Sequence, residues 1–319
     1  MARSKSRILI IGATGFIGRQ FTKSSLAAGH PTFLLVREFS ASSNPEKAKL
    51  LESFKASGAN ILPGSVEDYA SVVQAIRKVD VVISAVGCLQ LMSQMNIIKA
   101  IKEVGTIQRF IPSEYGVDYD RIYNPVGPIK TVVDDSLKIR RAVEAEGVPY
   151  TYIIGNLFAA YFVSSLGQLI LNGIPPRDKI AIYGDGNCKV SFLEEEDVAT
   201  FTIKTVDDPR TLNKSLHFMP PVNTMSVNEL VSQWEKMIGR TMEKIYVSEE
   251  ELLKNMADTQ WETSSTVGDA TFDMSCCHMV YFRGDLRNFQ FGPHGLEATQ
   301  LYPDLKYTNV VEEYLSPYA

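Results

Sequence analysis

The sequence is poor in cysteine, and its few cysteines show none of the spacings that bind metals. The four cysteines stand at positions 88, 188, 276 and 277, without a Cys-x-x-Cys pair and without a matching pair of histidines. Zinc sites and disulfide frameworks both depend on such regular spacings. We therefore expect no metal site and reduced thiols, which fit a cytoplasmic protein.

Clustered positive charge and long apolar runs are also missing. The formal net charge is −5, and we find no basic block longer than Arg140-Arg141. Surfaces that bind nucleic acid need clustered cations. No apolar run approaches the roughly 20 residues of a membrane span, and the run after the basic start is too short for a signal peptide. We expect a cytoplasmic protein that binds neither nucleic acid nor membrane.

The composition itself is that of a compact globular protein. The 319 residues are 45% hydrophobic and 22% charged, and no repeat or low-complexity segment is present. A chain of this length and composition forms one large domain or two modest ones. The oligomeric state stays open, a homodimer included.

Three glycines spaced by two residues follow the first apolar run. The segment from Arg7 to Gly18 has the pattern of a strand, a tight turn and a helix. Glycine lets the main chain turn sharply and approach a pyrophosphate, and a helix opening near Thr14 would offer free N–H groups and positive dipole to the phosphates. The spacing differs from the commoner GxGxxG, so the context has to support a dinucleotide cradle over an ordinary turn. The cradle residues that we predict to bind the cofactor are Gly12, Ala13, Thr14, Gly15, Phe16, Ile17 and Gly18.

The second predicted strand, 32–36, ends at a cation. In doubly wound folds the residue after this strand lies beside the adenosine ribose, where an arginine accepts a 2′-phosphate. Here Arg37 occupies that place, and Lys47 follows a short loop later. These cations favour NADPH over NADH, with Glu38 as the one counter-signal and a solvated surface arginine as the alternative.

Strand and helix patterns alternate regularly over residues 7–155. The run 80–86 is continuously apolar, as in a parallel strand buried on both faces, and its end at Val86 should lie along the cofactor. This alternation predicts an α/β fold with a Rossmann-like, doubly wound parallel sheet. We assign residues 1–155 to an NADPH-binding domain and residues 156–319 to a smaller, mostly helical substrate-binding region interleaved with the end of the sheet.

Several segments together resemble one plant protein family. The chain is similar to the isoflavone reductase-like family, which includes the pinoresinol–lariciresinol reductases and phenylcoumaran benzylic ether reductases. The resemblance covers the whole chain and implies an NADPH-dependent reductase of phenylpropanoid-derived substrates, an atypical relative of the short-chain dehydrogenases. It rests on Gly12–Gly18, Ile111–Gly116, Val148–Tyr152, Pro175–Lys179, Tyr183–Asn187, Asp208–Lys214 and the ending from Glu297 to Thr308.

The sequence agrees with the atypical relationship. A typical short-chain dehydrogenase carries Tyr-x-x-x-Lys on the helix after the fifth strand, and this chain has none there. The one such spacing, Tyr302 to Lys306, falls in the closing motif near the C-terminus. We interpret it as structural.

The catalytic lysine that the resemblance implies is missing. Aligned on 139–142, the family lysine falls three residues before Ile139, where this chain has Ser136. A serine hydroxyl can relay or orient a proton but is no base by itself. Lys138 lies about 200° around the predicted helix, on its solvent side, and Lys130 is more than a turn away. Alternatively, Ser136 only fills the helix face.

His278 is a further candidate for the acid/base role. It matches a histidine that many family members carry in the substrate region, and a histidine titrates near neutral pH. A purely structural role for His278 is an equally good interpretation of the sequence. The candidate catalytic residues are therefore Ser136, His278 and Lys138.

An aromatic helical stretch expected over 157–171 should form part of the substrate pocket. It follows the sixth predicted strand, at the sheet edge where ligands bind, and aromatic walls suit a planar phenolic substrate. We select Phe158 and Tyr161 as substrate-binding residues, although part of the stripe must be core.

The resulting hypothesis is hydride transfer from NADPH to a benzylic, enone or imine carbon of an aromatic plant metabolite, such as a lignan, an isoflavonoid or a related alkaloid. Two alternatives stay open because of Ser136. One is a cyclase, isomerase or eliminase that retains the cofactor, and the other is a non-catalytic NADPH-binding protein. The exact substrate and the stereochemistry do not follow from the sequence.

Overall fold

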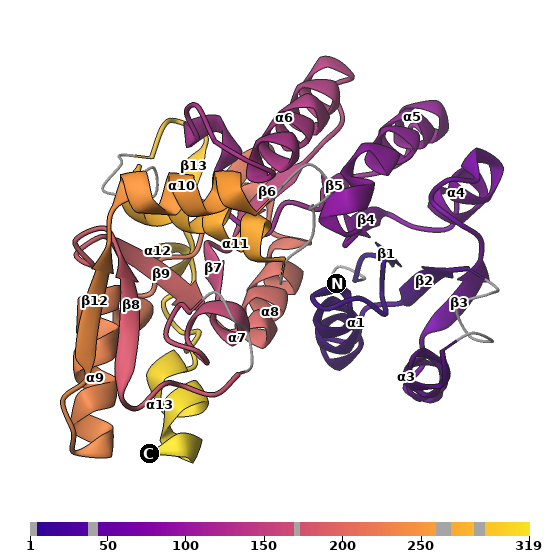
Figure 1. Cartoon of the computed structure of the whole chain (residues 1–319). Coiled ribbons are helices and arrows are strands. Elements are labelled where there is room, and N and C mark those ends of the chain that lie inside the picture. The colour runs from indigo at the N-terminus through magenta and orange to yellow at the C-terminus, as the bar shows by residue number, and fades with distance from the viewer. Residues whose placement is uncertain (1–4, 38–43, 169–172, 260–268, 284–290) are drawn as a thin grey trace.

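The computed structural model describes residues 5–37, 44–168, 173–259, 269–283 and 291–319. Its first half is built on a five-stranded parallel sheet in the order β3-β2-β1-β4-β5 (Figure 1). The strand β1 lies in the middle and pairs with β2 on one side and β4 on the other. The strands are β1 (Ile8–Ile11), β2 (Thr32–Val36), β3 (Asn60–Pro63), β4 (Val81–Ser84) and β5 (Arg109–Ile111). This order confirms the predicted Rossmann-like fold.

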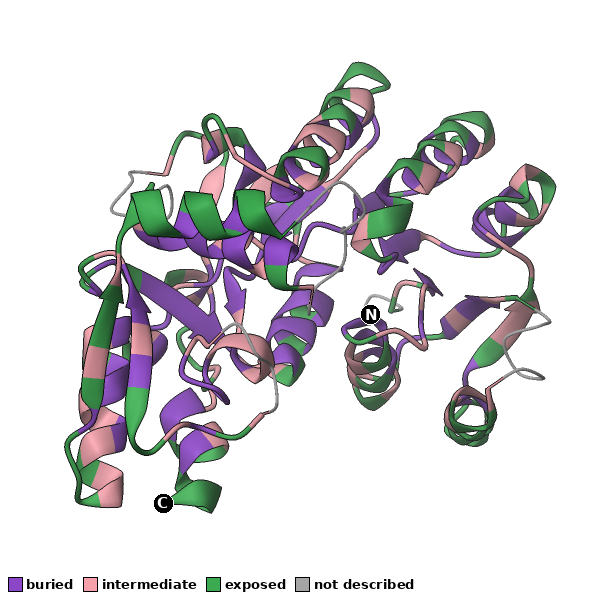
Figure 2. Cartoon of the chain, in the orientation of Figure 1, coloured by how far each residue is buried: buried purple, intermediate pink, exposed green. Residues whose placement is uncertain are grey.

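Helices cover both faces of this sheet. On one face, Ile8 and Ile10 of β1 pack in a core with Phe21 of α1. On the other face, Leu9 and Ile11 pack with residues of α4, α5 and α6. The buried strands and the exposed outer sides of the helices are visible in Figure 2. The covering helices are α1 (Gly18–Ala27), α3 (Pro45–Ala56), α4 (Tyr69–Ile76), α5 (Gln94–Val104), α6 (Ile129–Ala145) and α8 (Glu195–Thr205).

Local capping signals position several of these helices. Asn44 accepts hydrogen bonds from the amides of Glu46 and Lys47 at the start of α3, with Pro45 in the first turn. Asp68 caps α4 through the amide of Ala70. Such caps satisfy amides that have no partner inside the helix. Both helices thus begin directly after a capping residue.

The second half of the chain returns to the sheet. The amide of Phe110 in β5 donates to the carbonyl of Pro149 at 2.7 Å, which connects β5 to the region of β6 (Thr151–Ile154). The strand β6 pairs in parallel with β10 (Lys214–His217), and β10 pairs with β13 (Gly295–Glu297). Residues beyond 156 thus extend the same parallel arrangement.

Two small sheets and several helices complete this half. The sheets are β7 (Leu157–Phe158), β9 (Lys189–Leu193) and β11 (Thr224–Ser226), and β8 (Lys179–Tyr183) with β12 (Glu243–Val247). The helices are α9 (Val227–Ile238), α10 (Glu249–Asp258), α11 (Ala270–Cys277), α12 (Ala298–Leu301) and α13 (Val310–Leu315). Ser226 and Glu229 form a capping box at the start of α9, and at the start of α10 Ser248 accepts a hydrogen bond from the amide of Glu251. The region carries more strand than the sequence pattern predicts.

The aromatic helix expected over 157–171 does not form as predicted. Its first two residues pair as β7, and only Ala159–Phe162 (α7) is helical. Leu166 and Gly167 have φ angles of 55° and 73°, in the left-handed region that interrupts a right-handed helix. Residues 169–171 of the expected helix lie outside the described residues. In the described part of the chain, no helix combines the length and the apolar character needed to cross a membrane.

Candidate active site

A cavity of about 200 Å³ lies at the carboxyl ends of β1, β2 and β4. It is lined by the turn that follows β1 and by the first residues after β2 and β4. Ligands of open α/β sheets bind at this edge. Of the predicted cofactor-binding residues, those that line the cavity are Gly12, Ala13, Thr14, Gly15, Arg37, Lys47 and Val86.

The three glycines of the turn lack a side chain for different structural reasons. Gly12 has φ of 88°, and a Cβ there would lie 2.3 Å from the carbonyl oxygen of Ala85. A Cβ on Gly18 would lie 2.1 Å from the carbonyl oxygen of Gly12. At Gly15 the nearest atom, Gly12 O, is 3.1 Å away, and Gly15 faces both cavities of the site. Packing of the chain on itself therefore requires Gly12 and Gly18, whereas Gly15 leaves room for a ligand.

The helix α1 begins four residues later than expected. Thr14 lies in the turn, where Gly15 donates its amide to Gly12 O at 2.9 Å, and α1 begins at Gly18. No side chain caps this helix start, and the amides of Arg19 and Gln20 donate to the carbonyl oxygens of Gly15 and Ile17. What this helix start offers to an anion is its positive dipole end. The turn, the uncapped helix and the cations Arg37 and Lys47 fit a phosphorylated dinucleotide; Glu38 lies outside the described residues.

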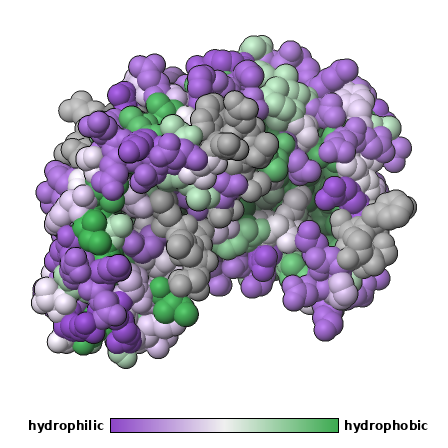
Figure 3. All heavy atoms as spheres, in the orientation of Figure 1, coloured by the Kyte–Doolittle hydropathy of each residue, from purple (hydrophilic) through white to green (hydrophobic). Residues whose placement is uncertain are grey.

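A larger cavity of about 420 Å³ adjoins the first one. The two share the lining residues Gly15, Ala85, Val86 and Gly87. Figure 3 shows hydrophobic side chains in a hollow between the part that holds the five-stranded sheet and the rest of the chain. The aromatic residues that line the larger cavity are Phe16, Tyr115, Tyr119, Phe158, Tyr161, Phe162 and Phe272.

The predicted substrate residues lie in this larger cavity. Phe158 and Tyr161 both line it, and the ring of Phe16 packs on them at 5.9 Å and 4.8 Å between centroids. Ile17 lines the same cavity. Phe16 and Ile17 therefore face the larger cavity and not the smaller one.

The larger cavity is lined by side chains with carboxyl, phenol and thiol groups. Among the described residues that line it, there is no lysine, arginine or histidine. Burial raises the pKa of Cys88, Cys276 and Cys277, so these thiols stay neutral. The described residues also include no cluster of three or more side chains that could hold a metal.

The structure does not bring Lys138 or His278 to this cavity. Lys138 is 61% exposed and pairs with Asp135 at 2.9 Å, on the solvent side of α6. His278 is buried, but its Nε2 lies 2.8 Å from Oε1 of Glu249, and its neighbours Cys277 and Met279 line the cavity instead. Lys130 pairs with Asp134 at 2.5 Å. Helix direction, which depends on packing, thus takes these groups away from the substrate.

Ser136 lies behind the cavity wall. It is 3% exposed and does not itself line the cavity, although Val132, one turn earlier, does. Its hydroxyl interacts with the phenol of Tyr119, in a contact that lacks the geometry of a well-formed hydrogen bond. Of these two residues, Tyr119 therefore lines the cavity and Ser136 does not.

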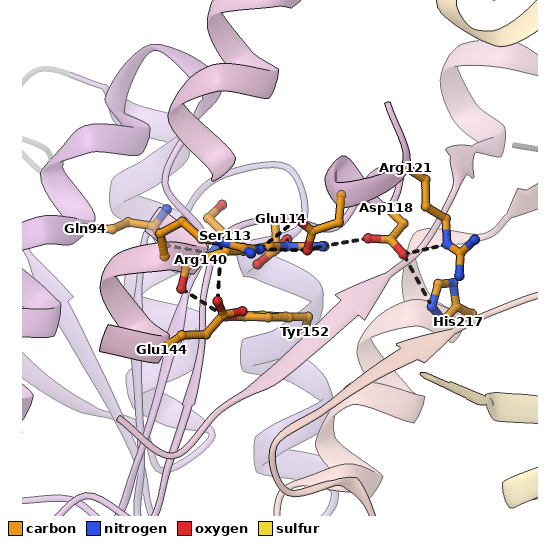
Figure 4. Close-up of polar contacts among 11 residues, drawn as sticks. Gln94, Ser113, Glu114, Asp118, Arg121, Arg140, Glu144, Tyr152 and His217 are labelled. Atoms are coloured by element: carbon orange, nitrogen blue, oxygen red, sulfur yellow. Dashed lines mark hydrogen bonds and ion pairs between the residues drawn. The ribbon is translucent and has the colours of Figure 1, made fainter. Parts of the chain in front are cut away.

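A buried arginine organises the loop that carries Tyr119. Arg140 of α6 is bound by Glu114, Asp118 and Asp120, with N–O distances of 2.6, 2.6 and 2.8 Å (Figure 4). Its guanidinium also lies 5.9 Å from the ring centroid of Tyr119. These contacts connect residues 114–120, which follow β5, to Arg140 in α6, which lies 20 to 26 residues after its three partners. They hold the loop in one position at the cavity.

The carboxyl groups around Arg140 differ in their protonation. Burial raises the pKa of Glu114 to about 7 despite the nearby Arg140. Burial also acts to raise the pKa of Asp118, but the Arg140 guanidinium outweighs it and lowers that pKa. Glu114 and Tyr119 both line the cavity, and the sequence interpretation missed both. The motif Ser113–Gly116 directly after a strand at the carboxyl edge of the sheet was the available signal.

Tyr302 and Lys306 are placed as the sequence interpretation expects. The Tyr302 hydroxyl donates to Oδ2 of Asp208 at 2.9 Å. Neither Tyr302 nor Lys306 lines either of the two cavities. The contact of Tyr302 with Asp208 supports the structural interpretation of this pair.

Comparison with known proteins places these features among plant reductases. A model of the NmrA-like family matches residues 4–315. The chain is 60% identical to phenylcoumaran benzylic ether reductase PT1 of Pinus taeda, covering 98% of each chain. It is 52% identical to eugenol synthase 1 of Petunia hybrida, covering 99% of each. The solved structure of AtPrR2 with NADP+ and (+)-pinoresinol is 38% identical and similar at a TM-score of 0.90, over 99% of this chain and 100% of that one.

Proposed function

The chain belongs to the NmrA-like family, and from this premise we propose that it is an NADPH-dependent reductase that delivers hydride to a benzylic carbon of a phenylpropanoid-derived substrate. The relatives named as a benzylic ether reductase and a eugenol synthase support this substrate class. We propose further that a carbon–oxygen bond at that carbon breaks during the reaction.

The observation that carries the proposal is the contact between the two cavities. A polar cavity with the glycine turn, Arg37 and Lys47 adjoins an aromatic one, and Gly15, Val86 and Gly87 line both. Gly12 to Gly15 would hold the pyrophosphate, and Arg37 with Lys47 would hold the 2′-phosphate. When bound, NADPH supplies the hydride. The shared wall is where a nicotinamide and a substrate carbon would meet.

The larger cavity suits an aromatic substrate in size and surface. Its volume of about 420 Å³ and its aromatic lining are typical of pockets that bury most of a small ligand. Residues 1–155 would hold the cofactor, while Phe158, Tyr161 and the α11 segment from residues 156–319 would supply much of the substrate wall. Planar rings pack well against such side chains.

The test is to follow NADPH absorbance with a panel of candidates. The panel contains one benzylic ether lignan, one isoflavonoid with a conjugated enone and one alkaloid imine. We expect NADPH oxidation with the ether, and a product that has gained one hydride and one proton by mass. Turnover of only the enone or the imine would move the reaction to another carbon. A product of unchanged mass without net NADPH oxidation would replace the proposal by an isomerase or cyclase.

A further inference from the structure

Breaking a carbon–oxygen bond leaves negative charge on the oxygen, so the site needs a hydrogen-bond or proton donor there. The described lining of the larger cavity offers no lysine, arginine or histidine for this. Its buried thiols are held neutral by raised pKa values, and thiols are weak donors. The Tyr115 hydroxyl already donates to the carbonyl of Ser84 at 2.5 Å. The donor must come from the remaining groups.

Tyr119 is a residue of the cavity wall with its hydroxyl near the cavity. It lines the cavity and is 8% exposed. Its hydroxyl lies 3.6 Å from the position that a Cβ on Gly116 would take, and Gly116 lines the same cavity. The buried Ser136 is close enough to lower the pKa of this phenol, although its hydroxyl forms no well-formed hydrogen bond. The Tyr119 hydroxyl is thus near both a cavity residue that has no side chain and a buried serine.

The surroundings fix this phenol before a substrate arrives. The residues on both sides of it, Asp118 and Asp120, are bound to Arg140 at 2.6 and 2.8 Å. Arg140 itself is 1% exposed and also holds Glu114. A donor that is already in place loses little conformational entropy during the reaction, which is the basis of electrostatic preorganisation.

The same surroundings keep the phenol protonated. Burial raises the pKa of Tyr119, the Glu114 carboxylate raises it further, and Ser136 and Arg140 lower it only partly. A neutral phenol donates a hydrogen bond, whereas a tyrosinate could not. The group therefore stays in its donor form across the neutral pH range.

We propose that Tyr119 is a catalytic residue that donates its phenolic proton to the substrate oxygen as the carbon–oxygen bond breaks, with Ser136 as its positioning residue. The proposal rests on the proposed function. Hydride from NADPH forms the new C–H bond, the electron pair of the C–O bond leaves on oxygen, and the Tyr119 O–H proton completes the product hydroxyl. The tyrosinate regains its proton from water after the product leaves.

The first test compares Tyr119→Phe with Tyr183→Phe in turnover of benzylic ethers. Tyr183 has the same 8% exposure in the same hydrophobic core, but it does not line the cavity. We expect Tyr119→Phe to lower kcat by at least about 100-fold and Tyr183→Phe to leave it nearly unchanged. The loss should shrink as electron-withdrawing groups make the leaving phenol more acidic, because an acidic leaving group needs no donor. A loss that is the same for all leaving groups, or that appears only in Tyr161→Phe, would overturn the proposal.

The second test does not depend on turnover. It measures the Kd of 4-substituted 2-methoxyphenols of graded acidity in the presence of NADP+. In the native protein, affinity should rise with phenol acidity, because a phenolate accepts a stronger hydrogen bond. Tyr119→Phe should flatten this dependence and weaken the most acidic phenol by about tenfold to 100-fold. An unchanged dependence in Tyr119→Phe would exclude Tyr119 as the donor.

The two tests separate the possible failures. If the native protein oxidises no NADPH with any of the substrates, the proposed function fails, and the phenol series still decides whether Tyr119 is the donor in this cavity. Ser136→Ala provides a second variant that keeps the Tyr119 side chain. It should lower kcat by roughly three- to tenfold and reduce the dependence on phenol acidity. If Ser136→Ala kept the native kcat and the native dependence of affinity on phenol acidity, Ser136 would not be a positioning residue.

Discussion

Nε of Arg140 lies 2.6 Å from Oε2 of Glu114, and the two side chains are 1% and 3% exposed. The pair connects α6 to the loop after β5, which lines the larger cavity. Buried ion pairs gain little net stability, but removing one partner leaves an uncompensated charge. The Arg140–Glu114 pair thus determines the path of a functional loop.

Arg140→Met should destabilise the protein by about 3–5 kcal/mol at pH 8, because Glu114 and Asp118 would stay buried without a cation. The loss should be smaller at pH 5.5, where Glu114 is protonated. Urea unfolding at the two pH values measures both effects. Arg141→Met is the control, since Arg141 is 57% exposed and its pairs should contribute about 1 kcal/mol or less. Equal losses in both variants would contradict this role.

Glu195→Gln should make stability less dependent on pH. Burial and the neighbouring Glu194 raise the pKa of Glu195 from 4.5 to about 7. The folded protein therefore binds this proton more tightly than the unfolded chain, and unfolding free energy falls as pH rises from about 4.5 to about 7. The glutamine removes this fall, so the variant should be more stable than the native protein above pH 7 by about 2–3 kcal/mol.

Thermal and urea unfolding over pH 5–9 checks this result. Glu196→Gln is the matched control, because Glu196 is the exposed neighbour of Glu195. Parallel pH curves for native protein and Glu195→Gln would mean that this carboxyl titrates normally in the folded state.

Arg37→Ala should weaken NADPH binding about tenfold or more and leave NADH nearly unaffected. Arg37 and Lys47 line the smaller cavity, and a well-formed contact with a 2′-phosphate contributes about 1.5–3 kcal/mol. Fluorescence titration with both cofactors gives the two Kd values. The exposed Arg77, which pairs only loosely with Glu103 at 3.7 Å, provides the control Arg77→Ala. Equal weakening of both cofactors by Arg37→Ala would refute the assignment.

Gly15→Val and Gly18→Ala should separate binding from stability. At Gly15 the added side chain would enter the cavities and its Cβ would lie 3.1 Å from Gly12 O, so dinucleotide binding should be lost with a smaller loss of stability than at Gly18. At Gly18 the Cβ would lie 2.1 Å from Gly12 O, so the variant should lose about 1–3 kcal/mol of stability. Normal NADPH binding by Gly15→Val would place the cofactor elsewhere.

The order of strands and helices in the first half could be predicted because its signals are local. Thr32–Val36 has the predicted bounds, and β4 (Val81–Ser84) falls within the predicted apolar run 80–86. The glycine turn and Arg37 could also be identified from their places in the chain. Hydrophobic periodicity and turn chemistry act within a few residues, so the sequence shows them directly.

The solvent-facing direction of Lys138 follows from helical periodicity, as the sequence predicts. The direction of His278 and the end of the aromatic helix could not be predicted in this way. His278 faces Glu249, and a left-handed pair at Leu166 and Gly167 interrupts the expected helix. Both outcomes depend on packing against segments far away in the sequence.

Local patterns in the sequence were enough to predict the βα alternation and the glycine turn, and they show that position 136 carries no lysine. That Tyr119 lines the larger cavity, with Arg140 holding both neighbouring aspartates, became visible only in the folded chain. This is because ion pairs with the buried Arg140 set the path of residues 114–120. The charged residues of these ion pairs come from a loop and from a helix that follows later, and nothing in their local patterns indicates that they meet.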